Sequence, residues 1–228
     1  MREHKQILLA NQAWAAELLD EDPEFFKRQV QGQRPKFLWI GCSDSRVSPE
    51  QMTQTPPGGM FLHRNIANLV HEDDLNLLSV LQFAVDVLQV PNIVLCGHHG
   101  CGGIKATLDG GVTGPVDRWL DEARRVRREH ADELDGLDEE AQVNRLVEVN
   151  VRDQLLNLAR TETVQSAFGR GQDLTLFGWV YDIRDGLLKP LMEIDRDTPL
   201  DGVGRPERVL VPTAELEAAE AAEAATGV

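Results

Sequence analysis

An apolar run from Phe37 to Cys42 ends in a thiol, and a carboxylate and a guanidinium follow it at Asp44 and Arg46. The run is rich in strand-forming residues and has polar, turn-forming residues on both sides, so it predicts a buried β-strand. Ligands of open α/β sheets bind at the carboxyl ends of the strands. We therefore expect the polar side chains at this end to belong to a functional site.

A second apolar run, residues 93–97, is followed by His98, His99 and Cys101. If the two runs form neighbouring strands, Cys42, His98 and Cys101 converge. Two thiolates and one imidazole are a ligand set that suits zinc, and three protein ligands leave one tetrahedral position open, as in catalytic zinc sites. The sequence therefore predicts one zinc ion per subunit at this edge of the sheet.

Two further residues of metal-binding type lie beside these candidates. Cys96 is inside the apolar run and is predicted to be a small buried hydrophobic residue. Only one of two adjacent residues can easily face a metal, so His99 is predicted to be a pocket or surface side chain. Three cysteines are too few for a disulfide framework and favour metal binding or catalysis.

The chain has 228 residues and a formal net charge of −15. Such an acidic chain is a poor partner for nucleic acid, whose phosphates require an excess of Lys and Arg. No run of 18 apolar residues occurs, so no membrane span is expected. The N-terminal residues lead into an amphipathic segment and not into a signal peptide, which predicts a cytoplasmic protein.

The pattern of the whole chain predicts an α/β fold with a mostly parallel central sheet flanked by helices. Further strands are expected at residues 60–65, 174–181 and 187–194, the last two forming a hairpin. Residues 49–59 are expected to form a loop. Helical spacing occurs at residues 4–30, with a break at Pro23, and at residues 71–90, 116–133 and 139–168, the last as one helix or two.

The chain is accordingly divided into three parts. Residues 1–35 form a helical arm that has nothing obvious to bury against before the sheet begins, so a partner subunit is its expected contact. Residues 36–200 form the zinc-binding catalytic domain. Residues 201–228 form an acidic tail or helix, frayed or disordered from Thr213 onward.

The motif Cys42-Ser-Asp44-Ser-Arg46 together with His98-x-x-Cys101-Gly-Gly resembles the β-class carbonic anhydrases, and the resemblance extends through Asp182. It implies that Cys42, His98 and Cys101 bind zinc, and that Asp44 and Arg46 form a dyad beside the metal. It also implies dimers or tetramers.

The resemblance further assigns the substrate pocket. Gln33 corresponds to a pocket glutamine of the family and is expected to reach the site from a partner subunit. The other pocket positions are Phe61, Ile66, Phe83, Val85 or Val87, and Gly102. The family often has tyrosine where this chain has Phe83, so a hydrogen bond from that hydroxyl is missing.

The implied reaction is reversible hydration of CO₂ by zinc-bound hydroxide. Zinc lowers the pKa of bound water toward about 7. Two thiolates reduce the effective charge of the ion, so activity is expected to rise on the alkaline side. Asp44 would orient the hydroxide by accepting its hydrogen bond, while Arg46 holds Asp44 through a bidentate pair.

Asp44 has a second expected role, because a carboxylate released by Arg46 can occupy the open zinc position. A subset of the family is inhibited in this way by bicarbonate at a noncatalytic pocket, and its residues resemble Trp39, Arg64 and Tyr181, with Gly41 leaving space. Indole, guanidinium and phenol groups all donate hydrogen bonds to an anion. The alternative is that the two aromatic residues belong to the core and that Arg64 pairs with an acid.

Three other functions remain open from the sequence. The same zinc ligands serve relatives that hydrolyse carbon disulfide or carbonyl sulfide. A noncatalytic zinc or bicarbonate-sensing protein is a second alternative, which the intact Asp44 and Arg46 disfavour. A thiol redox protein using Cys42 and Cys101 is the third, and zinc analysis would exclude it.

Overall fold

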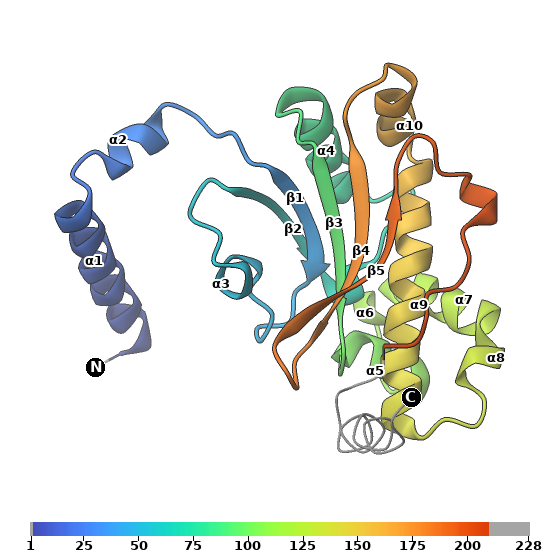
Figure 1. Ribbon diagram of the computed structural model, residues 1–228. Helices are drawn as coiled ribbons and strands as arrows, with labels where there is room; N and C mark the ends of the chain where they lie inside the picture. Colours follow the sequence, from blue (N-terminus) through green and yellow to red (C-terminus); the bar gives the residue numbers. More distant parts are fainter. Residues whose placement is uncertain (1, 210–228) are drawn as a thin grey trace, which may run out of the picture.

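The computed structural model describes residues 2–209, which contain a five-stranded sheet in the order β2-β1-β3-β4-β5 (Figure 1). β1 to β4 are parallel, and β5 pairs with β4 in the antiparallel direction. This arrangement confirms the mostly parallel sheet and the terminal hairpin. The strands are β1 (Phe37–Cys42), β2 (Met60–Asn65), β3 (Asn92–His98), β4 (Thr175–Asp182) and β5 (Leu187–Ile194).

Apolar clusters on the two faces of the sheet bury β1 and β3. In β1, Leu38, Ile40 and Cys42 belong to the main core, whereas Trp39 belongs to a smaller core on the opposite face. Side chains alternate between the faces of a strand. A strand covered on both faces therefore needs a nearly continuous apolar sequence, which is the pattern of residues 37–42.

The helices differ from the sequence prediction at residues 49–59 and at the start of α4 (Leu75–Gln82), and residues 139–168 follow one of the two predicted alternatives. A short helix, α3, occupies the start of the expected loop at 49–59. The helix expected from residue 71 begins only at Leu75, because the Asp74 side chain accepts a hydrogen bond from the Asn76 amide, and it continues into a π-helical turn, Phe83–Val87. Residues 139–168 form two helices, since the Thr161 side chain caps the second.

The described residues contain α-helices on both sides of these differences and a few short 3₁₀ turns. The helices are α1 (Glu3–Glu21), α2 (Phe25–Val30), α3 (Pro49–Thr53), α4 (Leu75–Gln82), α5 (Gly102–Asp109), α6 (Pro115–Trp119), α7 (Asp121–Glu129), α8 (Ala131–Leu134), α9 (Glu139–Arg160) and α10 (Glu162–Gly169); short 3₁₀ turns occur at Ile66–Asn68 and Leu200–Gly202.

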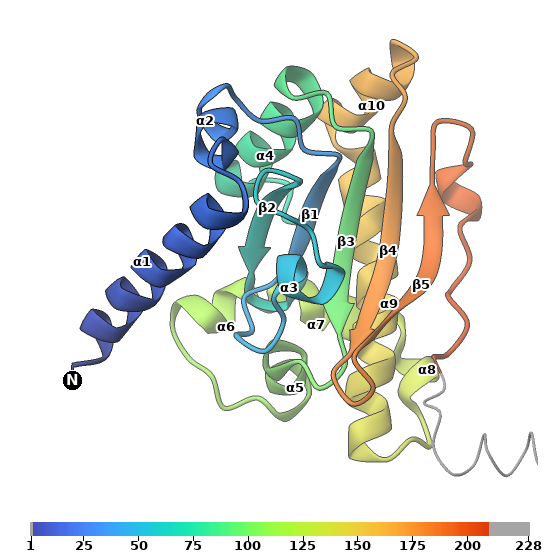
Figure 2. The same cartoon turned by 60° about the vertical axis from the view of Figure 1, so that its left-hand side comes forward.

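The long helix α9 lies along one face of the sheet, against β3 and β4 (Figures 1 and 2). The approach is close at Gly97, where an added Cβ would lie 2.7 Å from Cγ2 of Val151. α9 also carries buried polar side chains, including Asn144, Glu148 and Asn150. It can therefore hydrogen-bond to the loops at the carboxyl ends of the strands.

The N-terminal arm, α1 and α2, extends away from the sheet (Figures 1 and 2). Neither helix contains a buried residue. Large apolar side chains on the arm, such as Leu8 and Trp14, are exposed. This confirms the helical arm and leaves its apolar residues without a covering surface in the described part of the chain.

The C-terminal part of the described chain returns to α9. Arg152 donates hydrogen bonds to the carbonyl oxygens of Val203 and Gly204, and Arg145 donates to that of Pro206. The tail predicted from Thr213 lies outside the described residues. Within residues 2–209, no helix has both the length and the apolar character required to cross a membrane.

Candidate metal centre

The three predicted metal ligands come together at the carboxyl ends of two neighbouring strands. Cys42 is the last residue of β1 and His98 the last of β3, and these strands pair directly. Cys101 immediately precedes α5. The ligand atoms of the three residues all lie within 4.8 Å of one another, and all three residues are buried. The predicted convergence is confirmed.

The geometry of this cluster fits zinc. The Sγ atoms of Cys42 and Cys101 are 3.9 Å apart, and both thiols are free. Two sulfurs at about 2.3 Å from a tetrahedral zinc ion would be separated by about 3.8 Å. Nε2 of His98 is buried without a hydrogen-bond partner among the described residues, and Nδ1 lies 3.1 Å from the carbonyl oxygen of His99. Nδ1 therefore carries the proton, and Nε2 is free to bind a metal.

The two thiols influence each other's ionisation. A hydrogen bond from Cys101 lowers the pKa of Cys42 to about 4, and burial opposes this effect. The same contact and burial raise the pKa of Cys101 well above its ordinary value. Two adjacent buried thiolates repel each other, so a cation between them would stabilise the doubly ionised pair.

Cys96 behaves differently from these two residues. It lies in the smaller core with Trp39 and Val94, and its thiol donates to the carbonyl oxygen of Gly97. Burial raises the pKa of the Cys96 thiol far above its ordinary value. The prediction of a buried small hydrophobic residue is confirmed.

Asp44 lies beside the metal cluster and is paired with Arg46. Nε and Nη2 of Arg46 donate to Oδ1 and Oδ2 of Asp44 at 3.0 and 2.7 Å, and the Arg46 amide donates to Oδ1 at 2.9 Å. The Arg46 side chain holds the pKa of Asp44 well below its ordinary range, and burial opposes this effect. The carboxylate is therefore ionised. Its Oδ2 is 3.8 Å from Nε2 of His98, so it lies close to the predicted metal ligands.

Arg64 organises the backbone that carries Cys42 and Asp44. It donates hydrogen bonds at 2.7–2.8 Å to three carbonyl oxygens, those of Cys42, Asp44 and Val47. In the described part of the chain, Arg64 has no acidic partner within salt-bridge distance, unlike the alternative considered from the sequence. Sequence reasoning missed this structural role. Arg64 of β2 reaches carbonyl groups 17 to 22 residues earlier in the chain, and such contacts produce no local sequence pattern.

The four residues of the expected bicarbonate pocket share one face of the sheet. Gly41 is paired with Arg64 of β2, and Trp39 and Tyr181 belong to the smaller core on that face. Nε1 of Trp39 is buried and has no hydrogen-bond partner among the described residues. An added Cβ at Gly41 would lie 2.7 Å from this nitrogen. The site therefore has an unpaired buried donor, and the glycine avoids a side-chain clash with it.

The expected pocket walls are distributed unevenly. Phe61 and Phe83 stack at a centroid distance of 5.8 Å, and Ile66, Phe83 and Gly102 are exposed. Val85 is completely buried in the main core, whereas Val87 is 62% exposed. Of these two alternatives, only Val87 has accessible surface in the described chain.

Gln33 is exposed in the segment that precedes β1. It therefore lies near the amino end of this strand, and Cys42 lies at the carboxyl end. Six residues of strand span about 17 Å. Within one chain, the structure does not bring Gln33 to the metal ligands.

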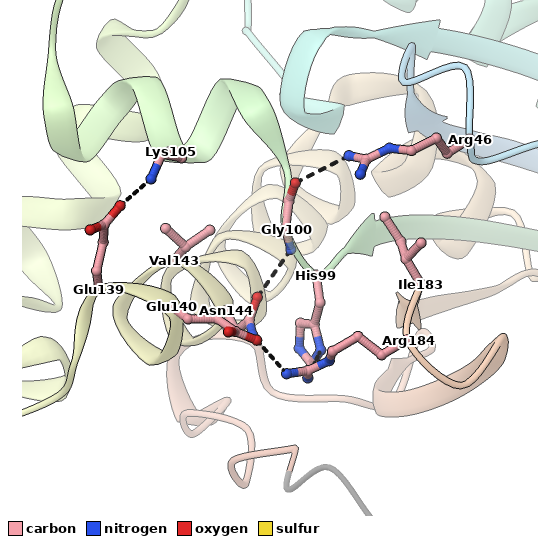
Figure 3. Close-up of a pocket in the computed structure, with 10 residues that line it drawn as sticks. All are labelled: Arg46, His99, Gly100, Lys105, Glu139, Glu140, Val143, Asn144, Ile183 and Arg184. Atoms are coloured by element: carbon pink, nitrogen blue, oxygen red, sulfur yellow. Dashed lines mark hydrogen bonds and ion pairs between the residues drawn. The ribbon is translucent and has the colours of Figure 1, made fainter.

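His99 belongs to the segment between β3 and α5, residues 99–101, which we call the metal-binding loop. It is only 2% exposed, so it is not a surface residue. It contributes to the wall of a cavity of about 440 Å³ (Figure 3), as the pocket part of the prediction requires. Arg46 and Asn144 reach Gly100 from opposite sides of this loop: Arg46 donates to its carbonyl oxygen at 3.3 Å, and Asn144 accepts from its amide at 3.0 Å. The cavity is lined by Arg46, His99, Gly100, Lys105, Glu139, Glu140, Val143, Asn144, Ile183 and Arg184.

The chain is similar in sequence to proteins named carbonic anhydrase. A family model described as carbonic anhydrase matches residues 37–188. A relative named carbonic anhydrase from Emericella nidulans is 42% identical over 189 residues, covering 82% of this chain and 83% of the relative.

Two solved structures are similar over most of the chain. The Coccomyxa β-carbonic anhydrase in complex with acetazolamide is 38% identical, with a TM-score of 0.82, covering 85% of this chain and 89% of that chain. One of two tetrameric β-carbonic anhydrases from Sordaria macrospora is 39% identical, with a TM-score of 0.82, covering 86% and 100%.

Proposed function

This chain belongs to the β-class carbonic anhydrases, and from that premise we propose that it catalyses the reversible hydration of CO₂ to bicarbonate and a proton. The cofactor is zinc, for which the ligands are Cys42, His98 and Cys101. The observation that carries the proposal is the convergence of these three donors within 4.8 Å, with a carboxylate oxygen of Asp44 3.8 Å from one of them.

Zinc held by Cys42, His98 and Cys101 would supply a hydroxide nucleophile by lowering the pKa of water toward about 7, although two thiolate ligands would weaken this effect. In our proposal, Asp44 accepts a hydrogen bond from the attacking hydroxyl group and directs its lone pair toward CO₂. An ionised carboxylate can only accept, and the low pKa of Asp44 keeps it ionised. Arg46 fixes the carboxylate in this orientation through two side-chain hydrogen bonds.

Bicarbonate inhibits the enzyme, we propose, through a second site on the opposite face of β1. Trp39 and Cys42 are three residues apart in this strand, so their side chains lie on opposite faces. The unpaired indole N–H of Trp39, the guanidinium of Arg64 and the phenol of Tyr181 are donors suited to an oxyanion.

The contacts of Arg64 supply a route between the two sites. Its donors hold the carbonyl oxygens of Cys42, Asp44 and Val47. An anion that draws the guanidinium away would loosen this loop and free Asp44 from Arg46. The released carboxylate would then be able to become the fourth zinc ligand and block the site.

Self-association as a dimer or tetramer completes the proposed active site. The exposed arm and the exposed Phe83 and Val87 provide apolar surface for a partner subunit. Gln33 would enter the pocket from that partner. Phe61, Ile66 and Gly102 would form the walls of the pocket. The tetrameric relative from Sordaria macrospora supports this assembly.

The proposed domain division is 1–35 for the arm, 36–200 for the catalytic domain and 201–228 for the tail. The matched family region, 37–188, lies within the second part. The cytoplasmic location stays a prediction from the sequence.

Stopped-flow CO₂ hydration combined with zinc analysis tests the proposed function. The purified protein is expected to contain one zinc per subunit and to show activity that rises between about pH 7 and pH 9. Cys42→Ser is expected to lose both zinc and activity, whereas Cys96→Ala, a change at a buried cysteine outside the cluster, is expected to keep both. A metal-free protein with full activity would contradict the proposal, and so would a zinc-loaded protein without CO₂ hydration.

A further inference from the structure

His99, the residue that follows the zinc ligand His98, is enclosed by two buried carboxylates. Its Nε2 is 3.2 Å from Oε1 of Glu148, and its Nδ1 is 3.3 Å from Oδ2 of Asp182. The exposed fractions of His99, Glu148 and Asp182 are 2%, 1% and 0%. Nη2 of Arg184 also lies 3.2 Å from Nδ1 of His99. The ring has little rotational freedom, because turning it would break its polar contacts at both nitrogens inside a buried site.

Both carboxylates are themselves fixed by cations. Arg145 donates to Oε2 of Glu148 at 2.7 Å, and Arg184 and Lys189 donate to Asp182 at 3.0 and 3.2 Å. The charge of each carboxylate is thus balanced. The pair therefore forms a rigid support beneath the metal-binding loop.

The main chain of His99 connects this support to the metal ligand. Its carbonyl oxygen accepts the hydrogen bond from Nδ1 of His98, which leaves Nε2 of His98 directed toward the two thiols. Its amide donates to the carbonyl oxygen of Tyr181. A displacement of His99 would consequently turn the imidazole of His98 away from the metal.

We propose that Glu148 is a positioning residue for the zinc ligand His98, and that it acts through the side chain and the carbonyl group of His99. Asn144, one helical turn earlier on α9, supports the same loop by accepting the hydrogen bond from the Gly100 amide, as Figure 3 shows. Among the described residues, neither side chain forms a hydrogen bond or ion pair with Cys42, His98 or Cys101. Their effect is on how long zinc is retained, and this inference rests on the zinc site of the proposed function.

The chain contains a matched control for this arrangement. His130 and Asp153 form a second buried histidine–carboxylate pair, with Nε2 and Oδ1 3.1 Å apart. Asp153 lies on α9 like Glu148, and its other hydrogen-bond partner is Arg152. Substitution of Asp153 removes a comparable buried charge from the same helix without touching the metal-binding loop.

The test compares zinc release from Glu148→Gln, Asn144→Ala, Asp153→Asn and the unchanged protein, each isolated with zinc bound. Release into an excess of a chromogenic chelator is followed by absorbance, and thermal unfolding is measured in parallel. Outer partners of metal ligands change metal affinity by about 10- to 100-fold. We expect about tenfold faster release from Glu148→Gln, a smaller acceleration from Asn144→Ala, and release within about twofold of the unchanged protein from Asp153→Asn.

A cobalt-substituted sample supplies a second readout. The visible spectrum of cobalt reports the geometry of its ligands, and it is expected to change in Glu148→Gln and not in Asp153→Asn. Unchanged release from Glu148→Gln would overturn the proposal, as would equal acceleration in Asp153→Asn. If Glu148→Gln does not fold, the comparison of Asn144→Ala with Asp153→Asn decides. Zinc content of the unchanged protein is measured first, so absence of the metal site is distinguished from failure of this inference.

Discussion

Replacing Trp39 with phenylalanine should relieve bicarbonate inhibition while leaving CO₂ hydration at low bicarbonate intact. Nε1 of Trp39 is a buried donor without a partner among the described residues. Phenylalanine keeps an aromatic ring in the smaller core and removes this donor. Because Trp39 and Cys42, a proposed zinc ligand, lie on opposite faces of β1, the metal centre should remain intact.

The size of the effect follows from the lost hydrogen bond. A hydrogen bond to a charged group contributes about 1.5–3 kcal/mol, which corresponds to about 10- to 160-fold weaker bicarbonate binding. Stability in bicarbonate-free buffer should change little. The smaller ring loses packing worth about 1–3 kcal/mol, but removal of an unsatisfied buried donor returns a similar amount.

Bicarbonate should also stabilise the unchanged protein more than the variant. At about 100 times its dissociation constant, a ligand adds about 2.7 kcal/mol to the free energy of unfolding. A tenfold weaker site would add about 1.4 kcal/mol, and a 100-fold weaker site about 0.4 kcal/mol. Urea unfolding with and without bicarbonate measures this difference, and initial rates of CO₂ hydration at increasing bicarbonate measure the inhibition.

Two further variants isolate the role of the indole N–H. Gly41→Ala keeps the tryptophan but would put a methyl group 2.7 Å from Nε1, so the indole must shift and inhibition should also weaken. Trp179→Phe changes a tryptophan on the same face, whose ring centroid is 6.1 Å from that of Trp39, and should preserve inhibition. Bicarbonate inhibition of Trp39→Phe equal to that of the unchanged protein would refute the reasoning, and so would equal loss in Trp179→Phe.

The remaining predictions concern the dyad and acid stability. Arg46→Lys keeps a positive charge but loses the bidentate contact with Asp44. Because the Arg46 side chain is 56% exposed, the lost hydrogen bond is worth only about 1 kcal/mol. The value of kcat/KM for CO₂ should therefore fall about fivefold in stopped-flow assays. An unchanged kcat/KM would count against a positioning role for the dyad. Burial would raise the pKa of Asp153, but hydrogen bonds from His130 and Arg152 outweigh it and hold the pKa below the ordinary value of 3.8. Its folded pKa is depressed, so its stabilising contribution is complete above about pH 4 and is lost as pH falls through the folded pKa. Urea unfolding of Asp153→Asn should therefore depend less on pH below about pH 4 than that of the unchanged protein, and parallel pH profiles would contradict this linkage.

The proposed metal ligands were predictable because each belongs to a short local pattern. Cys42 and His98 end apolar runs, and parallel neighbouring strands place such ends side by side. The strands beginning at Phe37 and Met60 could likewise be bounded from composition and turn residues. The same reasoning placed the start of the helix at residue 71 and not at Leu75, since a local side-chain cap at Asp74 competed with helical spacing.

Only the tertiary structure assigned the supporting residues. Glu148 lies 49 residues from His99 in sequence, and on an otherwise amphipathic helix its charge resembles that of any solvated side chain. The available signal was weak: Asn144 and Glu148 are polar residues four apart on a helix with many apolar positions. Likewise, the burial of Val85 in the main core and the exposure of Val87 depend on how the π-helical turn packs beside α10.

The sequence by itself determined which atoms can bind the metal, because ligand chemistry depends on residue type and on the ends of local elements. The fold decided how those atoms are held: which carbonyl groups Arg64 draws together, which carboxylates enclose His99, and which indole N–H is left without an acceptor. Those contacts join residues distant in the chain, and packing of the whole sheet and α9 sets them, whereas periodicity and local propensity contain no record of them.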